Sequence, residues 1–186
     1  EVMYPTPMIE CYETVQWAMD HAAELGIDPE KVVLGGNSAG ATLTATTCLR
    51  AQEQGGRMPA LALLIYPACD PFVTPEAEDL LNSGMDLTRL ENRGMLYNAM
   101  FTNNDPALEH EVYLNLNSAT EEQLQRFPET VVITAGKDYL RYGGEKFASK
   151  LAVSGNRVTL QRFCGSAHGF YARCTADWQQ ARALVY

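Results

Sequence analysis

The sequence has little positive charge and no long apolar run. Fourteen lysine and arginine residues stand against 23 aspartate and glutamate residues, so the formal net charge is −9. Binding to nucleic acid or to an anionic membrane surface needs basic side chains, and this balance argues against both kinds of partner. No stretch approaches the roughly 18 apolar residues of a membrane span. The acidic balance is instead typical of a soluble protein.

The cysteines lack any pattern that would mark a disulfide framework or a metal site. They are odd in number, and no pair has Cys-x-x-Cys spacing: Cys11, Cys48, Cys69, Cys164 and Cys174. A mature secreted protein rarely leaves one thiol unpaired. We therefore expect reduced cysteines in a cytoplasmic protein, with no metal and no organic cofactor.

The order of apolar patterns indicates the fold class. Four stretches have the composition of strands, the first three as apolar runs typical of strands buried on both faces: 31–35, 61–66, 131–136 and 158–163. Helical patterns precede and separate them, at 9–25, 39–54 and about 143–154. This alternation predicts an α/β fold, with a mostly parallel sheet and flanking helices. The length of 186 residues fits a single domain.

A glycine-flanked serine stands between the first predicted strand and the next helix. Residues 36–40 read Gly-Asn-Ser-Ala-Gly and fit the pattern Gly-x-Ser-x-Gly, which holds a serine on a tight strand-to-helix turn. The glycines remove Cβ atoms that would clash in such a turn. We predict that Ser38 is a nucleophile and that the Ala39 N–H faces a developing oxyanion. The alternative is a glycine-rich turn in which Ser38 only caps the helix.

A serine hydroxyl needs an adjacent base, and the sequence offers three histidines. His21 lies within a helical pattern and His110 stands between two glutamates, so both fit packing or surface roles. His168 follows the last predicted strand in a loop of small residues, from which an imidazole can reach over the strand ends. We predict that His168 is the base.

The carboxylate that orients the base should lie between serine and histidine in the sequence. Asp138 comes just after the third predicted strand, at the end of a parallel sheet where ligand sites cluster. There it would hold the histidine in the correct tautomer. Asp70 follows the second predicted strand in the same way and is the alternative acid.

These segments together resemble the hormone-sensitive-lipase-like family of carboxylesterases, which have the α/β-hydrolase fold. The likeness covers nearly the whole chain and is carried, in family order, by residues 36–40, 66–67, 134–141 and 168–170. It implies a serine esterase that hydrolyses short-chain acyl esters through an acyl-enzyme, with Ser38, Asp138 and His168 as its triad and a small ester as its partner. Two departures from the family, Asn37 and Tyr142-Gly143, concern the hydrogen bonds around the triad.

The family's His-Gly-Gly-Gly loop, whose N–H groups complete the oxyanion hole, does not occur in these residues. We therefore expect the chain to be the C-terminal two-thirds of a catalytic domain, 1–186, with the N-terminal strands missing. One oxyanion donor is worth about 10²–10³ in rate, so we expect impaired activity. A bared sheet edge invites pairing with another chain, which makes a homodimer an expectation.

Residues 72–110 are the least regular part of the chain, and we expect a cap or acyl-pocket segment there. Four apolar residues are candidates for lining the pocket: Met95, Leu96, Met100 and Phe101. Core packing is the alternative for these side chains.

Two other functions stay open at this point. One is a catalytically impaired or non-catalytic member of the same fold that binds a small ligand. The other is a peptidase or an acyltransferase, which would share the triad and differ in the pocket.

Overall fold

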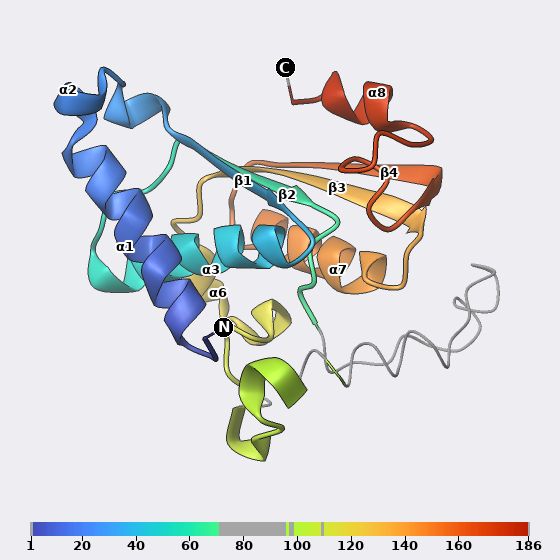
Figure 1. The fold of residues 1–186 in the computed structure, drawn as a ribbon, viewed down its shortest axis with the longest axis horizontal. Coiled ribbons are helices and arrows are strands. Elements are labelled where there is room, and N and C mark those ends of the chain that lie inside the picture. Colours follow the sequence, from blue (N-terminus) through green and yellow to red (C-terminus); the bar gives the residue numbers. More distant parts are fainter. Residues whose placement is uncertain (1, 71–95, 97–98, 109, 186) are drawn as a thin grey trace.

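The structure, a computed structural model, describes residues 2–70, 96, 99–108 and 110–185. In this part of the chain, parallel strands form one four-stranded sheet in the order β1-β2-β3-β4 (Figure 1). The strands are β1 (Val33–Asn37), β2 (Leu61–Ile65), β3 (Glu129–Lys137) and β4 (Val158–Ala167). The predicted parallel sheet is confirmed. β4 continues four residues beyond its predicted end, up to the residue before His168.

Helices cover both faces of this sheet. α3 (Ala39–Gln54) and α7 (Arg141–Val153) lie on one face, and α8 (Trp178–Arg182) lies on the other (Figure 1). α1 (Thr6–Asp20) packs against α3. Short helices also occur in the described residues, among them α2 (Ala22–Leu25), α6 (Glu121–Leu124), η1 (Pro29–Lys31), η2 (Pro106–Leu108) and η3 (Leu116–Ser118). The helix predicted over 9–25 is divided between α1 and α2 at His21.

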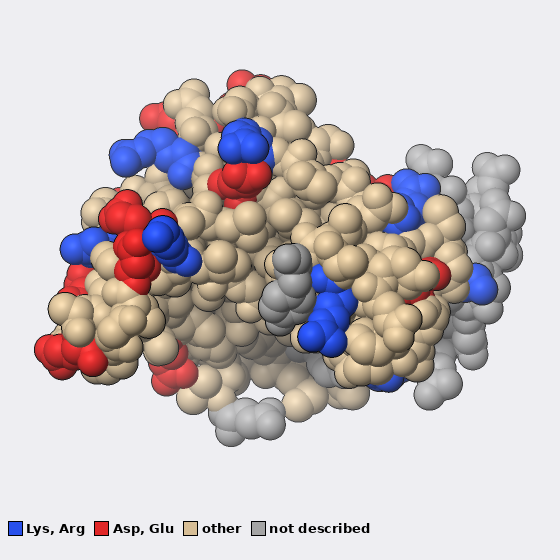
Figure 2. All heavy atoms as spheres, turned by 90° about the horizontal axis from the view of Figure 1, so that it is seen from above, with Lys and Arg blue, Asp and Glu red and all other residues tan. Residues whose placement is uncertain are grey.

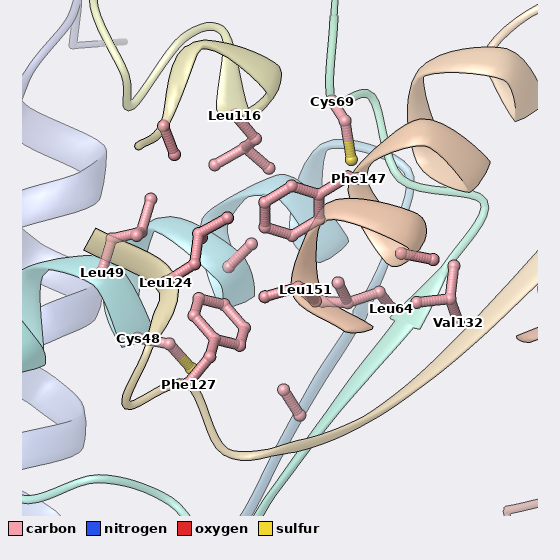
Figure 3. Packing of buried hydrophobic residues seen from close by; sticks show 14 of the residues in the cluster. Cys48, Leu49, Leu64, Cys69, Leu116, Leu124, Phe127, Val132, Phe147 and Leu151 are labelled. Carbon is pink, nitrogen blue, oxygen red and sulfur yellow. The ribbon is translucent and has the colours of Figure 1, made fainter. Parts of the chain in front are cut away.

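The alternation of side chains along β2 divides the core in two. Ala62 and Leu64 point to the face covered by α3 and α7, where they join Phe147 and Leu151 in the larger cluster (Figure 3). Residues 63 and 65 point to the α8 face, where the smaller cluster contains Tyr66, Ile133, Phe170 and Ala181 among its members. Apolar packing therefore holds each face of the sheet against its own helices.

The first strand differs from its prediction. Val33 is 57% exposed, so the expectation of a strand buried on both faces is wrong for β1. The reason is its place in the sheet, because in the described residues β1 pairs with β2 on one side only. Pairing of two chains through this edge stays a prediction.

The predicted cap or pocket segment, 72–110, is described only at residue 96 and at 99–108 and 110. Met95 lies outside the described residues. Across the described ranges, none of the helices combines the length and the apolar character that a bilayer crossing requires.

Phe147 tests the larger core cluster. Its side chain is fully buried and its ring centroid lies 5.9 Å from that of Phe127. We expect Phe147→Ala to lower the free energy of unfolding by about 3–5 kcal/mol, because the buried ring is lost and a cavity remains. Val153→Ala on the same helix, where the side chain is 76% exposed, should change it by less than about 0.5 kcal/mol. Urea denaturation measures both, and equal losses would contradict this assignment of the core.

Candidate active site

Ser38 occupies the turn between β1 and α3 in a backbone conformation that only strong local contacts maintain. Its φ of 55° and ψ of −122° lie in a region that residues other than glycine rarely adopt. The Ser38 N–H donates to the carbonyl oxygen of Ile65 at 2.9 Å, and the Ser38 carbonyl accepts from Ala41 at 3.0 Å. These two hydrogen bonds hold the turn against β2 and against the first turn of α3.

The two glycines of the turn are not equivalent. A Cβ atom added at Gly36 would lie 2.3 Å from the carbonyl carbon and oxygen of Gly40, which leaves no room for a side chain. A Cβ atom at Gly40 would meet nothing within 4 Å outside its own helix. The expected steric need for glycine therefore holds at Gly36 and is wrong for Gly40.

Side chains from three strand ends meet at this turn. The Ser38 Oγ lies 2.9 Å from the His168 Nε2, and the His168 Nδ1 lies 2.6 Å from the Asp138 Oδ2. A carboxylate can only accept hydrogen bonds, so Nδ1 carries the proton and donates it to Asp138. Nε2 is then an acceptor for the Ser38 hydroxyl. The three side chains that the sequence places 100 and 30 residues apart thus form one continuous hydrogen-bond chain.

The Asp138 carboxylate is out of contact with water. Its side chain is fully buried, while the His168 side chain is 31% exposed. The Asp138 Oδ1 accepts the Leu140 N–H at 3.1 Å, and the Asp138 N–H donates to the Ala135 carbonyl at 3.2 Å. Hydrogen bonds therefore hold both carboxylate oxygens, which fixes the direction in which Asp138 meets the imidazole.

An irregular register between β3 and β4 brings Asp138 beside His168. Ala135 pairs with Phe163, but the next paired residues are Lys137 and Ala167, so β4 carries two extra residues. Asp138 and His168 each follow the last paired residue of their strand, and they leave the sheet side by side. The strands approach so closely here that a Cβ atom at Gly136 would lie 2.5 Å from the Cα of Cys164.

A hydrogen bond between two side chains closes the loop that carries His168. The fully buried Ser166 donates its Oγ–H to the Asp177 Oδ2 at 2.8 Å, and Asp177 stands at the start of α8. Inside the loop, the Thr175 N–H donates to the carbonyl of Phe170 at 3.0 Å, and the Phe170 ring is buried. Sequence reasoning missed this clamp because Ser166 and Asp177 match no motif.

Ala39 is the first residue of α3, directly after Ser38. The N–H groups of the first helical turn have no acceptor within the helix and point out of its N-terminus. The Ala39 N–H is therefore free of an intrahelical partner beside the serine, and it is a suitable donor for an oxyanion.

The alternative acid and the other histidines do not join this hydrogen-bond chain. Asp70 packs against the start of α7, where a Cβ atom added at Gly143 would lie 3.1 Å from the Asp70 Cβ. The His21 ring stacks on Trp17 at 4.6 Å, on the surface of α1. The Ser118 hydroxyl donates to the backbone carbonyl of His110 at 3.4 Å.

The structure describes three of the expected pocket residues, and one of them, Phe101, lies beside the N-terminal segment. Leu96 and Met100 are each 57% exposed. The Phe101 ring is half-buried and lies edge-on to Tyr4 at 6.1 Å, and its carbonyl accepts the Tyr4 N–H. A role in an acyl pocket stays a prediction for these residues.

The face that carries α8 has a mixed surface. Figure 2 shows charged side chains of both signs scattered over it, with broad uncharged areas between them. Among the described residues, no group of three histidine, cysteine, aspartate or glutamate side chains is arranged to hold a metal ion.

The sequence profile of the α/β-hydrolase fold family matches residues 1–172. The chain belongs to this family. An arylesterase of Saccharolobus solfataricus is 31% identical over 176 residues, which are 91% of this chain and 54% of the arylesterase. The hormone-sensitive lipase of Bos taurus is 40% identical over 68 residues, 37% of this chain and 9% of the lipase. The expected likeness of this α/β hydrolase to hormone-sensitive lipase is confirmed.

A solved esterase structure has the same fold. Carboxyl esterase 2 of the fungus Tuber melanosporum superposes on 99% of this chain with a TM-score of 0.87 and 29% identity, and the match covers 61% of the fungal chain. This α/β hydrolase chain thus spans little more than half the length of the curated arylesterase and under two thirds of the fungal esterase.

The turn of this α/β hydrolase can be tested at its two glycines. Gly36→Ala should lower the thermal unfolding midpoint, because the new Cβ meets backbone atoms that cannot move aside. Gly40→Ala should leave the midpoint unchanged or raise it, because alanine favours a helix by about 0.5–1 kcal/mol over glycine. Differential scanning fluorimetry measures both, and a destabilised Gly40→Ala beside a stable Gly36→Ala would contradict the geometry of the turn.

Proposed function

We propose that this protein is a serine carboxylesterase that hydrolyses short-chain acyl esters through an acyl-enzyme intermediate. The observation that carries the proposal is the hydrogen-bond chain from the Ser38 hydroxyl through the His168 imidazole to the Asp138 carboxylate. The esterases among the relatives support the ester as substrate class. The short acyl chain follows the resemblance of the motifs to the hormone-sensitive-lipase-like carboxylesterases.

Acylation begins at the serine. The Ser38 Oγ attacks the ester carbonyl while the His168 Nε2, 2.9 Å away, takes its proton. The imidazolium that forms donates Nδ1–H to Asp138, whose buried negative charge stabilises it. The carbonyl oxygen becomes an oxyanion and accepts from the Ala39 N–H at the start of α3.

The reaction is completed in two stages, release of the alcohol and hydrolysis of the acyl-enzyme. The tetrahedral carbon expels the alcohol oxygen, which takes the proton from His168 Nε2 and leaves as the alcohol. A water molecule next gives a proton to His168 and attacks the acyl carbon bound to Ser38. The second tetrahedral intermediate expels the Ser38 oxygen, which regains its proton, and the carboxylic acid leaves.

The serine carries the first test. Ser38→Ala should lower hydrolysis of a short-chain nitrophenyl ester at least about 10⁴-fold, because no nucleophile remains. A fluorophosphonate probe should label these 186 residues at Ser38 only weakly, because the second oxyanion donor does not occur in them, and it should leave the variant unlabelled. Circular dichroism should show equal folding, since alanine at position 38 adds no atom to the turn. Equal turnover by variant and parent would refute the assignment, and faster turnover of the matching amide would favour a peptidase.

Asp70 provides a matched control for a test of Asp138 as the acid of the triad. Asp138→Asn should lower kcat for the same ester by about 10⁴, by analogy with other triads, because the amide cannot hold the imidazole in the required tautomer. Asp70→Asn should leave kcat close to its original value, because the His168 Nδ1 donates to Asp138 and not to Asp70. Steady-state kinetics compare the two, and greater damage from Asp70→Asn would show that the acid is misassigned.

A further inference from the structure

Tyr66 occupies the strand end that separates the nucleophile from the acid. It follows β2 directly, while Ser38 follows β1 and Asp138 follows β3. The sheet order is β1-β2-β3-β4, and His168 comes from the end of β4. To reach Ser38, the imidazole must therefore extend across the ends of β3 and β2. Tyr66 stands at the second of these ends.

The Tyr66 side chain contacts the histidine loop at three points. Its ring centroid lies 4.8 Å from that of the His168 imidazole, with the planes at 61°. It lies 5.8 Å from the ring of Phe170. The Tyr66 hydroxyl oxygen accepts the N–H of Ala172 at 3.3 Å. Burial raises the pKa of this hydroxyl, so it stays protonated and neutral beside the imidazole.

The backbone around Tyr66 is itself rigidly held. The Tyr66 N–H donates to the Ile133 carbonyl on β3 at 2.6 Å, and the preceding carbonyl, of Ile65, accepts the N–H of Ser38 at 2.9 Å. The residue is 1% exposed and has a φ of 41°, which is rare for an aromatic residue. Such a conformation persists only where the surroundings enforce it, and it clusters at functional sites.

The imidazole needs a support that its hydrogen bonds do not provide. The bonds made by Nδ1 and Nε2 lie near the plane of the ring and hold its two ends. They resist displacement out of this plane only weakly. A neighbouring ring at 4.8 Å blocks such displacement on the side where it packs.

We propose that Tyr66 is a positioning residue for His168: its ring limits the tilt of the imidazole, and its hydroxyl holds the loop that carries it. This inference rests on the proposed esterase function, because it assigns a role in the same triad. In the proposed reaction Tyr66 forms no bond and transfers no proton, so it acts through His168.

Three variants test the proposal. Tyr66→Leu removes the ring that faces the imidazole, Tyr66→Phe removes only the hydroxyl, and Phe147→Leu removes an equally buried ring from the other core cluster, which does not contain Tyr66. Turnover of a short-chain nitrophenyl ester is measured per Ser38 titrated with a fluorophosphonate. If Tyr66→Leu does not fold, Tyr66→Met takes its place with the same expectations.

Tyr66→Leu should lower kcat by about 10- to 100-fold at nearly constant KM, because the base is displaced and substrate contacts are not. Tyr66→Phe, which keeps the ring, should retain most of the parent's kcat. Phe147→Leu should be less stable than the parent but have the same kcat. Unchanged kcat in Tyr66→Leu, or an equal fall in Phe147→Leu, would overturn the proposal.

Proton NMR separates this inference from the proposed function. The hydrogen bond from His168 Nδ1 to Asp138 gives a far-downfield proton signal that does not depend on turnover. The signal should persist in Tyr66→Phe and Phe147→Leu and should broaden or vanish in Tyr66→Leu. A parent protein without esterase activity or labelling would refute the proposed function alone. A signal that is unaltered in Tyr66→Leu would refute the positioning role, whatever the activity.

Discussion

The site depends on one contact, the 2.6 Å hydrogen bond between the His168 imidazole and the buried Asp138 carboxylate. A carboxylate without access to water is costly unless donors surround it, and His168 and the Leu140 N–H supply them. The same bond fixes which imidazole nitrogen faces Ser38. The end of β3, the loop after β4 and the turn after β1 are therefore coupled through a single ring.

Two strained residues flank this ring. Ser38 and Tyr66 both have positive φ, and conformations of this kind cost of order 1–3 kcal/mol each. Each is fastened by a backbone hydrogen bond to the neighbouring strand, Ser38 to Ile65 and Tyr66 to Ile133. The clusters on the two faces of the sheet keep these strands in register, so burial far from the site offsets the strain at its centre. The Ser166–Asp177 hydrogen bond closes the histidine loop, which itself contains two further residues with positive φ, Cys174 and Ala176.

Sequence reasoning predicted the parallel sheet, and it also singled out Ser38, Asp138 and His168, which the structure brings together. The prediction of the sheet is confirmed because it rests on local chemistry, in which apolar runs with β-branched residues predict buried strands. The turn at Ser38 also follows from a local pattern, a serine between glycines at a strand end, and the catalytic roles of the three residues stay predictions. Where local composition is ambiguous, sequence reasoning failed. Val33 belongs to an apolar run, yet it is exposed because β1 has a neighbour on one side only in the described residues.

The sequence by itself therefore determined the fold class and the serine, histidine and aspartate of the candidate triad, since both are written in short patterns. Only the tertiary structure decided between Asp138 and Asp70 as the partner of His168, because both follow strands and differ in what lies beside them. It alone revealed the two extra residues of β4 and the place of Tyr66 under the histidine loop. Contacts between strand ends depend on the order of strands in the sheet and on their register, and residues far apart in the chain carry no local signal of either.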